Sequence, residues 1–232
     1  MSESRAKLSG GRWSPANAAH PGDRFGLVFT LLLVSFVATA LLSERPARIV
    51  TTLLYFGALV LAMRLAPFSP RTTRRLRWGL LAASAIVALL TALLSGRVIE
   101  GVAAFWVAGI LSFTVSMIVV RVLHHRVVTM QTIFGALSAY LLVGFIFTAL
   151  FTATARLMNA QFFTGGEQPT STTIQYFSFI TLTTTGYGDL TPAGQPGRSL
   201  AVLCALSGQI FLVTLVARLV SVLGTQRNLP GD

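Results

Sequence analysis

Long apolar stretches separated by short polar breaks run along the chain from residue 25 onward. A transmembrane helix needs about 20 mostly apolar residues. Six segments come near that length, at residues 25–42, 49–65, 78–94, 102–120, 133–151 and 200–222. The breaks contain prolines, glycines and charges, as in Ser43-Glu44-Arg45-Pro46. Because the connections are short, we expect consecutive helices to be antiparallel neighbours in an all-α membrane protein with six spans.

One further helical pattern is too short to cross a membrane. Residues 171–185 place Ile174, Phe177 and Ile180 roughly three apart and are rich in threonine. At about 1.5 Å per residue, a helix of this length reaches only half-way through a bilayer. It lies between the last two predicted spans and precedes a Gly-Tyr-Gly sequence. We expect a re-entrant half-helix, which is tolerated at membrane depth only where protein or a water-filled cavity satisfies its ends.

Composition supports a membrane protein and argues against an enzyme. Hydrophobic residues make up 53% of the chain and charged residues 11%, whereas a soluble domain has about a quarter of its residues charged. Three histidines and one cysteine are too few for a conventional metal site or a disulfide. The predicted spans contain no Asp, Glu or His arranged for catalysis. We therefore expect no enzyme activity and no cofactor.

The net charge of +11 fits orientation in a membrane better than nucleic-acid binding, because the basic residues lie between apolar segments and not on one soluble face. If the N-terminus is cytoplasmic, thirteen of the 18 lysines and arginines fall on the inner side and five on the outer side. Cytoplasmic loops carry such an excess. We expect a multi-pass protein of the plasma membrane with both termini cytoplasmic. Residues 1–24 would form a basic tail, and residues 224–232 a short one.

The sequence Thr184-Thr185-Gly186-Tyr187-Gly188 can form a cation site from its own backbone. Glycines at alternate positions give access to backbone conformations closed to other residues, so successive carbonyl groups can point to one side. Four such strands around an axis form stacked rings of oxygen atoms that replace the water shell of a cation. The Thr184 hydroxyl can supply the innermost ring. One chain supplies a quarter of each ring, which predicts a four-fold homo-oligomer.

The run Thr183-Thr184-Thr185-Gly186-Tyr187-Gly188-Asp189 resembles the signature of the tetrameric potassium channel superfamily. The resemblance covers about residues 130–221 and implies an outer helix, a pore helix, a selectivity filter and an inner helix in each of four identical subunits. It implies K+ as the transported ion, bound through Thr184, Thr185, Gly186 and Tyr187, with Asp189 at the outer mouth. Gly208 lies 20 residues after Gly188, where the family has its hinge glycine.

The filter region departs from the family pattern at three places. Thr185 stands where the family usually has Val or Ile, so it adds a hydroxyl behind the filter. Ile180 stands where some bacterial members have a buried Glu paired with the filter Asp. Tyr176 and Phe177 replace two tryptophans of some members, and Phe177 cannot donate a hydrogen bond to Tyr187.

The chain divides into a four-helix transmembrane domain at residues 25–123 and a pore domain at residues 124–223. A voltage sensor carries an arginine at every third position within a span. The fourth predicted span has no charge before Arg121 at its inner end. We therefore expect no voltage sensor and a passive potassium-selective channel. A weakly selective cation channel is the alternative; a transporter of several pore-like repeats would need more than the single half-helix found.

The inner half of the pore domain suggests further roles. Helical periodicity places Leu212 and Val216 on one face beyond Gly208, where they would line the inner pore or, as the alternative, pack against the fifth span. Histidines 124 and 125 lie at the predicted cytoplasmic junction, where they either sense inner pH or are simply interfacial. With them, Arg121 and Arg126 could hold an anionic lipid headgroup.

Overall fold

The computed structural model describes residues 25–41, 57, 70–94, 96–124, 130–158 and 160–227. The helices in these ranges are α1 (Phe25–Leu41), α3 (Pro70–Leu93), α4 (Arg97–His124), α5 (Met130–Leu157), α6 (Ser171–Leu182) and α7 (Gln195–Arg227). The described part contains no β-strand beyond an isolated bridge between Phe163 and Pro192. The predicted second span, residues 49–65, lies outside the described residues except for Gly57.

Three of the described helical segments are long and apolar enough to cross a membrane, at Arg97–Val120, Met130–Leu157 and Gln195–Leu215. Two further apolar helices, Phe25–Leu41 and Trp78–Thr91, are shorter. All-α architecture is therefore confirmed for the described part, and the number of six spans remains a prediction. The last helix also extends past the predicted end of the pore domain at residue 223, because α7 continues to Arg227.

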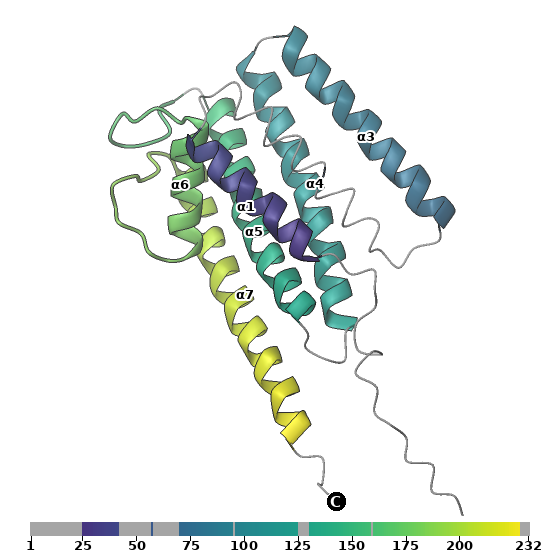
Figure 1. Ribbon diagram of the computed structural model, residues 1–232. Helices are drawn as coiled ribbons and strands as arrows, with labels where there is room; N and C mark the ends of the chain where they lie inside the picture. Colours follow the sequence, from purple (N-terminus) through teal and green to yellow (C-terminus); the bar gives the residue numbers. More distant parts are fainter. Residues whose placement is uncertain are drawn as a thin grey trace, which may run out of the picture.

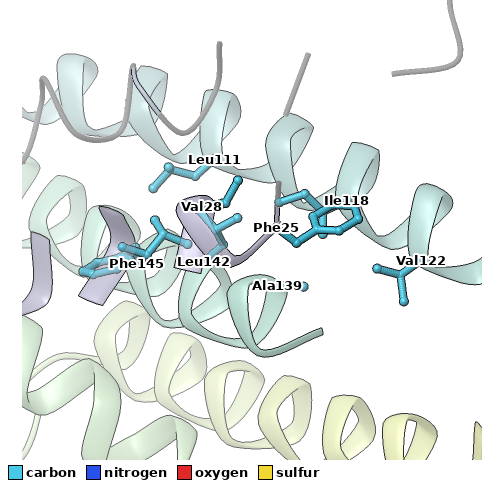
Figure 2. Close-up of a cluster of buried hydrophobic side chains, with 9 residues drawn as sticks. Phe25, Val28, Leu111, Ile118, Val122, Ala139, Leu142 and Phe145 are labelled. Atoms are coloured by element: carbon cyan, nitrogen blue, oxygen red, sulfur yellow. The ribbon is translucent and has the colours of Figure 1, made fainter. Parts of the chain in front are cut away.

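Helix α5 is the centre of the arrangement and contacts α1, α4, α6 and α7. Figure 1 shows α1 crossing α5, with α4 beside it, α3 outermost, and α6 and α7 on the other side. Side chains from α1, α4 and α5 form one buried cluster, most of which is labelled in Figure 2. Its members are Phe25, Val28, Leu32, Leu111, Ile118, Val122, Ala139, Leu142 and Phe145. Because lipid tails are as apolar as these side chains, close packing holds such helices together.

Helix α1 also reaches the short helix α6. The Gln175 side chain, 4% exposed, donates to the Phe36 carbonyl oxygen at 3.0 Å. The Thr172 hydroxyl donates to the Thr39 carbonyl at 3.1 Å, in the last turn of α1, where carbonyl groups lack helical partners. The Phe36 ring meets the Phe179 ring edge-on, with 4.9 Å between centroids. The first helix of the chain therefore supports α6 directly.

A glycine brings α5 and α6 close together. The Phe179 ring lies against Gly144, where an added Cβ would be 2.5 Å from the Phe179 Cζ atom. The Ser178 hydroxyl, fully buried, donates to the Gly144 carbonyl oxygen at 2.8 Å. Small residues permit such close helix contacts in membranes. This contact and those with α1 fix the position of α6.

Candidate functional site

Helix α6 begins and ends through its own threonines. The Thr170 hydroxyl accepts a hydrogen bond from the Thr173 amide at 3.1 Å, which satisfies one free amide of the first turn. After Leu182, the Thr183 amide and hydroxyl both donate to the Phe179 carbonyl, at 3.0 and 2.8 Å. The helix has 12 residues, or about 18 Å of length. A short helix is therefore present where the half-helix was predicted, ending three residues before the predicted residue 185, and its re-entrant placement in a membrane stays a prediction.

The backbone of residues 184–188, the filter segment, alternates in handedness. The torsion angle φ is +55° at Thr184, +51° at Gly186 and +81° at Gly188, and it is not positive at Thr185 or Tyr187. Alternation of this kind aligns successive amide groups on one side of the chain, which leaves the carbonyl groups on the other. The positive φ at both glycines fits the expectation of backbone conformations closed to other residues. Positive φ at β-branched Thr184 was not foreseen, and such strain occurs mostly at functional sites.

Three of the five amide groups of the filter segment, those of Thr184, Thr185 and Gly186, are directed back toward α6. The Thr184 amide donates to the Thr181 carbonyl at 3.0 Å. The amides of Thr185 and Gly186 donate to the Ile180 carbonyl at 2.9 and 3.2 Å. These bonds satisfy carbonyl groups that the end of α6 would otherwise leave without partners. Within the described part of the chain, the filter carbonyls accept no hydrogen bond, and all five filter residues are exposed.

Electrostatics at the inner end of the filter segment favour a cation. The C-terminus of a helix carries a partial negative charge of roughly half an electron, and α6 ends directly before this segment. The added hydroxyl of Thr185 has a partner, since its oxygen lies 2.9 Å from the Thr183 hydroxyl oxygen. It therefore adds a side-chain link between the filter and the end of α6.

Tyr176 holds the residue that directly follows the filter segment, Asp189. Its hydroxyl donates to a carboxylate oxygen of Asp189 at 2.7 Å, and this hydrogen bond, with a smaller effect of burial, raises the pKa of the Tyr176 phenol. Phe177, in contrast, is 4% exposed and packs against Phe151 and Phe163. Sequence reasoning noted that Phe177 cannot brace the filter but missed the Tyr176 bond. The signal available was a phenol on the half-helix, 13 residues before the carboxylate.

The loops on either side of α6 and the filter are joined. The Thr164 amide donates to the Thr191 carbonyl at 2.9 Å, and the Ala193 amide donates to the Phe162 carbonyl at 2.8 Å. Arg198, at the start of α7, donates from Nε to the Pro192 carbonyl at 3.0 Å. The segment that follows Asp189 is therefore fixed to both the preceding loop and the last helix.

Helix α7 is in close contact with the end of α6 at Gly208. An added Cβ at Gly208 would overlap the Leu182 carbonyl oxygen and lie 3.1 Å from its carbonyl carbon. One turn earlier, the buried Cys204 thiol donates to the Ser178 carbonyl at 3.6 Å. Helix α7 continues through Gly208 without a break. Close approach is the requirement the structure shows at this glycine, and the hinge role remains a prediction.

Beyond Gly208, neighbouring residues of α7 have different surroundings. Phe211 packs against Tyr140 of α5, with 5.5 Å between ring centroids, whereas Leu212 is 41% exposed. Gln209, which sequence reasoning did not single out, donates from Nε2 to the Thr184 hydroxyl oxygen at 3.2 Å. The side chain of Val216 is not among those described. The pore-lining role of Leu212 and Val216 thus remains a prediction.

The residues predicted at the cytoplasmic junction lie at the end of α4 and after it in the sequence. His124 is the last residue of α4, but its side chain and that of Arg121 are not described. His125 and Arg126 lie outside the described residues, as do residues 1–24 and 228–232. The pH-sensing and lipid-binding roles therefore stay predictions.

Residues 135–225 match a protein-family model described as an ion channel. The matched region contains most of α5, all of α6, the filter segment and most of α7. It lies where the signature of the tetrameric potassium channels was found in the sequence. No curated protein and no solved structure matches the chain. The match confirms the resemblance to the potassium channel superfamily.

Proposed function

From the match of residues 135–225 to the ion channel family, we propose that this chain is one subunit of a homotetrameric, potassium-selective channel. K+ would bind between the carbonyl oxygens of Thr184, Thr185, Gly186 and Tyr187, with the Thr184 hydroxyl as the innermost ligand. Asp189 would lie at the outer mouth. Conduction would be passive, because ions move down their own gradient between oxygen rings.

The geometry of the filter segment is the observation that carries this proposal. Its φ angles alternate in sign, three of its five amides donate to carbonyl groups at the end of α6, and its residues are exposed within one subunit. A backbone group without a partner in hydrocarbon costs several kcal/mol. A segment at the end of a half-helix therefore needs cover by protein and water. Ions on a central axis, surrounded by other copies of the segment, supply it.

The surface of α7 supports assembly with further copies of the chain. Within one subunit, only 11% of the most apolar stretch of α7, in Gln195–Leu215, is buried. Large exposed apolar residues cover it, namely Val202, Leu203, Leu206, Ile210, Leu212 and Val213. Gln209 is exposed on the same helix, and a polar amide faces lipid only at considerable cost. A closed ring of four subunits would cover much of this surface and direct the amides to a shared aqueous cavity.

We further propose that the channel lies in the plasma membrane with both termini cytoplasmic, and that it is not strongly voltage-gated. Arg156 pairs with Glu100 at 3.1 Å, and Arg97 donates to the Met158 carbonyl at 2.8 Å. Arg97, Glu100 and Arg156, which a cytoplasmic N-terminus with six spans would put on the outer side, therefore meet at one end of α4 and α5. Between residues 102 and 120, α4 carries no charge that a membrane potential could move.

A reversal-potential measurement tests the function. Purified protein would be reconstituted into planar bilayers with K+ on one side and Na+ on the other. We expect current that reverses close to the K+ equilibrium potential. Reversal near zero would instead identify a weakly selective monovalent cation channel. Absence of conductance from protein that is inserted and tetrameric would contradict the channel assignment.

A further inference from the structure

We propose that Gln209 is a positioning residue for ion binding at the inner end of the filter, because it holds the hydroxyl of Thr184. This inference rests on the proposed channel function. The Nε2 atom of Gln209 lies 3.2 Å from the Thr184 Oγ1 atom, and the two residues are 25 positions apart in the chain. The bond therefore joins the inner helix to the first residue of the filter segment.

The position of Gln209 is set by rigid backbone contacts. Gly208, the preceding residue, is buried against the backbone of Leu182, only two residues before Thr184. The Cys204 thiol contacts the Ser178 carbonyl one turn earlier. Successive residues of a helix are about 100° apart. The side chain of Gln209 therefore points in a different direction from Gly208, while the contact of Gly208 with Leu182 holds the backbone of both residues in place. Figure 1 shows α7 running past α6 and continuing beyond it.

The hydrogen bond controls which part of the Thr184 hydroxyl can meet an ion. A hydroxyl has one hydrogen and two lone pairs. The amide of Gln209 donates to one lone pair, which holds the oxygen in place and leaves the second lone pair as a cation ligand. Thr184 has φ +55°, an uncommon conformation for a β-branched residue, whose χ1 angle is already restricted by its two Cβ substituents. The rotation of the hydroxyl about its Cβ–Oγ1 bond is still free, and the bond from Gln209 fixes it.

Gln209 also changes the expected lining of the cavity. It lies three residues before Leu212, on the same side of α7 as the predicted pore-lining residues. In the proposed tetramer, four amides would surround the axis below the four Thr184 hydroxyls, and apolar side chains would begin only below them. A partly dehydrated K+ would thus meet neutral polar groups before it enters the filter.

Block by Ba2+ from the cytoplasmic side measures the inner ion site. Ba2+ is close to K+ in size and carries twice the charge, so it binds more tightly to the same oxygen ligands. We expect Gln209→Leu, which removes the donor at similar volume, to weaken the block about tenfold or more, because four hydrogen bonds are lost together. Gln209→Asn, too short to reach Thr184, should weaken it as well. Gln195→Leu removes an exposed amide at the start of α7 and should leave the block unchanged.

A double-mutant cycle separates positioning of Thr184 from a general change in the cavity. If Gln209 acts through the hydroxyl, Gln209→Leu should have no further effect on Ba2+ block in a Thr184→Ala background. Additive effects of the two substitutions would overturn the inference, and so would an unchanged Ba2+ block in the Gln209→Leu and Gln209→Asn tetramers. If the wild type is K+-selective, the proposed function stands in either case. A wild type without K+-selective current would overturn both.

Should Gln209→Leu fail to yield tetramers, Gln209→Glu provides an independent variant. The introduced side chain, when ionised, would accept a hydrogen bond from the Thr184 hydroxyl and add negative charge near the site. We expect Gln209→Glu to strengthen the Ba2+ block when Thr184 is unchanged. In the Thr184→Ala background, the same substitution should strengthen the block less. Equal gains in both backgrounds would mean that charge alone acts, which also contradicts the positioning role.

Discussion

The backbone of Gly208 lies directly against the carbonyl group of Leu182, so that no side chain separates the last helix from the end of the half-helix. Leu182 is fully buried, and the filter segment begins two residues later. A side chain added on α7 at this point would therefore press on the end of α6 from which residues 184–188 begin. A glycine that permits close approach has different consequences on mutation from a glycine that permits bending.

Gly208→Ala distinguishes these two roles. Its Cβ would overlap the Leu182 carbonyl, and overpacking of this kind costs roughly 1–3 kcal/mol, more than the gain of about 1 kcal/mol in helix propensity. We expect a lower melting temperature of the tetramer and weaker K+ current. Gly109→Ala on α4, where an added Cβ meets nothing within 4 Å, is the matched control and should be neutral or stabilising. A Gly208→Ala tetramer of full stability with only altered opening would favour the hinge role.

Gly188→Ala tests the filter backbone. Space is available at Gly188, since an added Cβ meets nothing within 4 Å, but its φ is +81°. A side chain in this region costs of order 1 kcal/mol or more in each subunit. We expect loss of K+ current with membrane insertion largely intact. Gly165→Ala, also in open space but without positive φ, should conduct normally. Normal selective current from Gly188→Ala would remove the basis of the filter assignment.

Tyr176→Phe tests the link at the outer mouth. The substitution removes the hydrogen bond to Asp189 and leaves the ring. Because the carboxylate then loses its anchor on α6, we expect K+ current to decline faster during sustained recording. Tyr140→Phe, which keeps the ring contact with Phe211, serves as the control. Identical time courses for the wild type and Tyr176→Phe would show that the outer mouth is held by other contacts.

The tyrosine bond also has a defined pH dependence. The pKa of Tyr176 is raised in the folded protein, so its contribution to stability is present below the ordinary phenol value of about 10. That contribution is lost as the pH rises through the raised pKa. In Tyr176→Phe this alkaline loss should be absent when the melting temperature of the tetramer is followed against pH.

Features that repeat along the sequence could be predicted, whereas contacts between distant residues could not. Apolar length indicated α4, α5 and α7, and the alternating glycines indicated positive φ at Gly186 and Gly188. The positive φ of Thr184 depends on the amide bonds to the end of α6, which no local propensity reveals. The contacts of Gln175 with α1 and of Gln209 with Thr184 span 139 and 25 positions. Their partners are set by packing, which periodicity alone does not specify.

Gating should be nearly independent of voltage. One moving charge in each of four subunits would contribute about 9 kcal/mol per 100 mV. The stretch of α4 between residues 102 and 120 has no charge to supply it. We therefore expect the steady-state open probability to change little between about −100 and +100 mV, a window chosen to make that energy visible. A steep sigmoid relation between conductance and voltage would contradict the absence of a sensor.

Leu212→Ser tests the apolar part of the inner pore. Leu212 is 41% exposed in a single subunit, while its neighbour Phe211 provides the contact with α5. Leu212 is therefore free of α5 and available to the cavity, to another subunit or to lipid. If it lines the cavity, an apolar constriction there closes by dewetting, and a hydroxyl should favour a hydrated, conducting pore. We expect a higher open probability in single-channel recordings, with little change in tetramer yield.

Phe211→Ser is the comparison that decides between these roles for Leu212. The Phe211 ring lies 5.5 Å from the Tyr140 ring and is a packing contact, so its loss should lower the melting temperature and the yield of the tetramer. If Leu212→Ser behaves in the same way and does not raise the open probability, Leu212 is a packing residue between subunits. The gate would then lie elsewhere on α7. If the two variants differ as expected, adjacent residues of one helix serve packing and conduction separately, as their different exposure indicates.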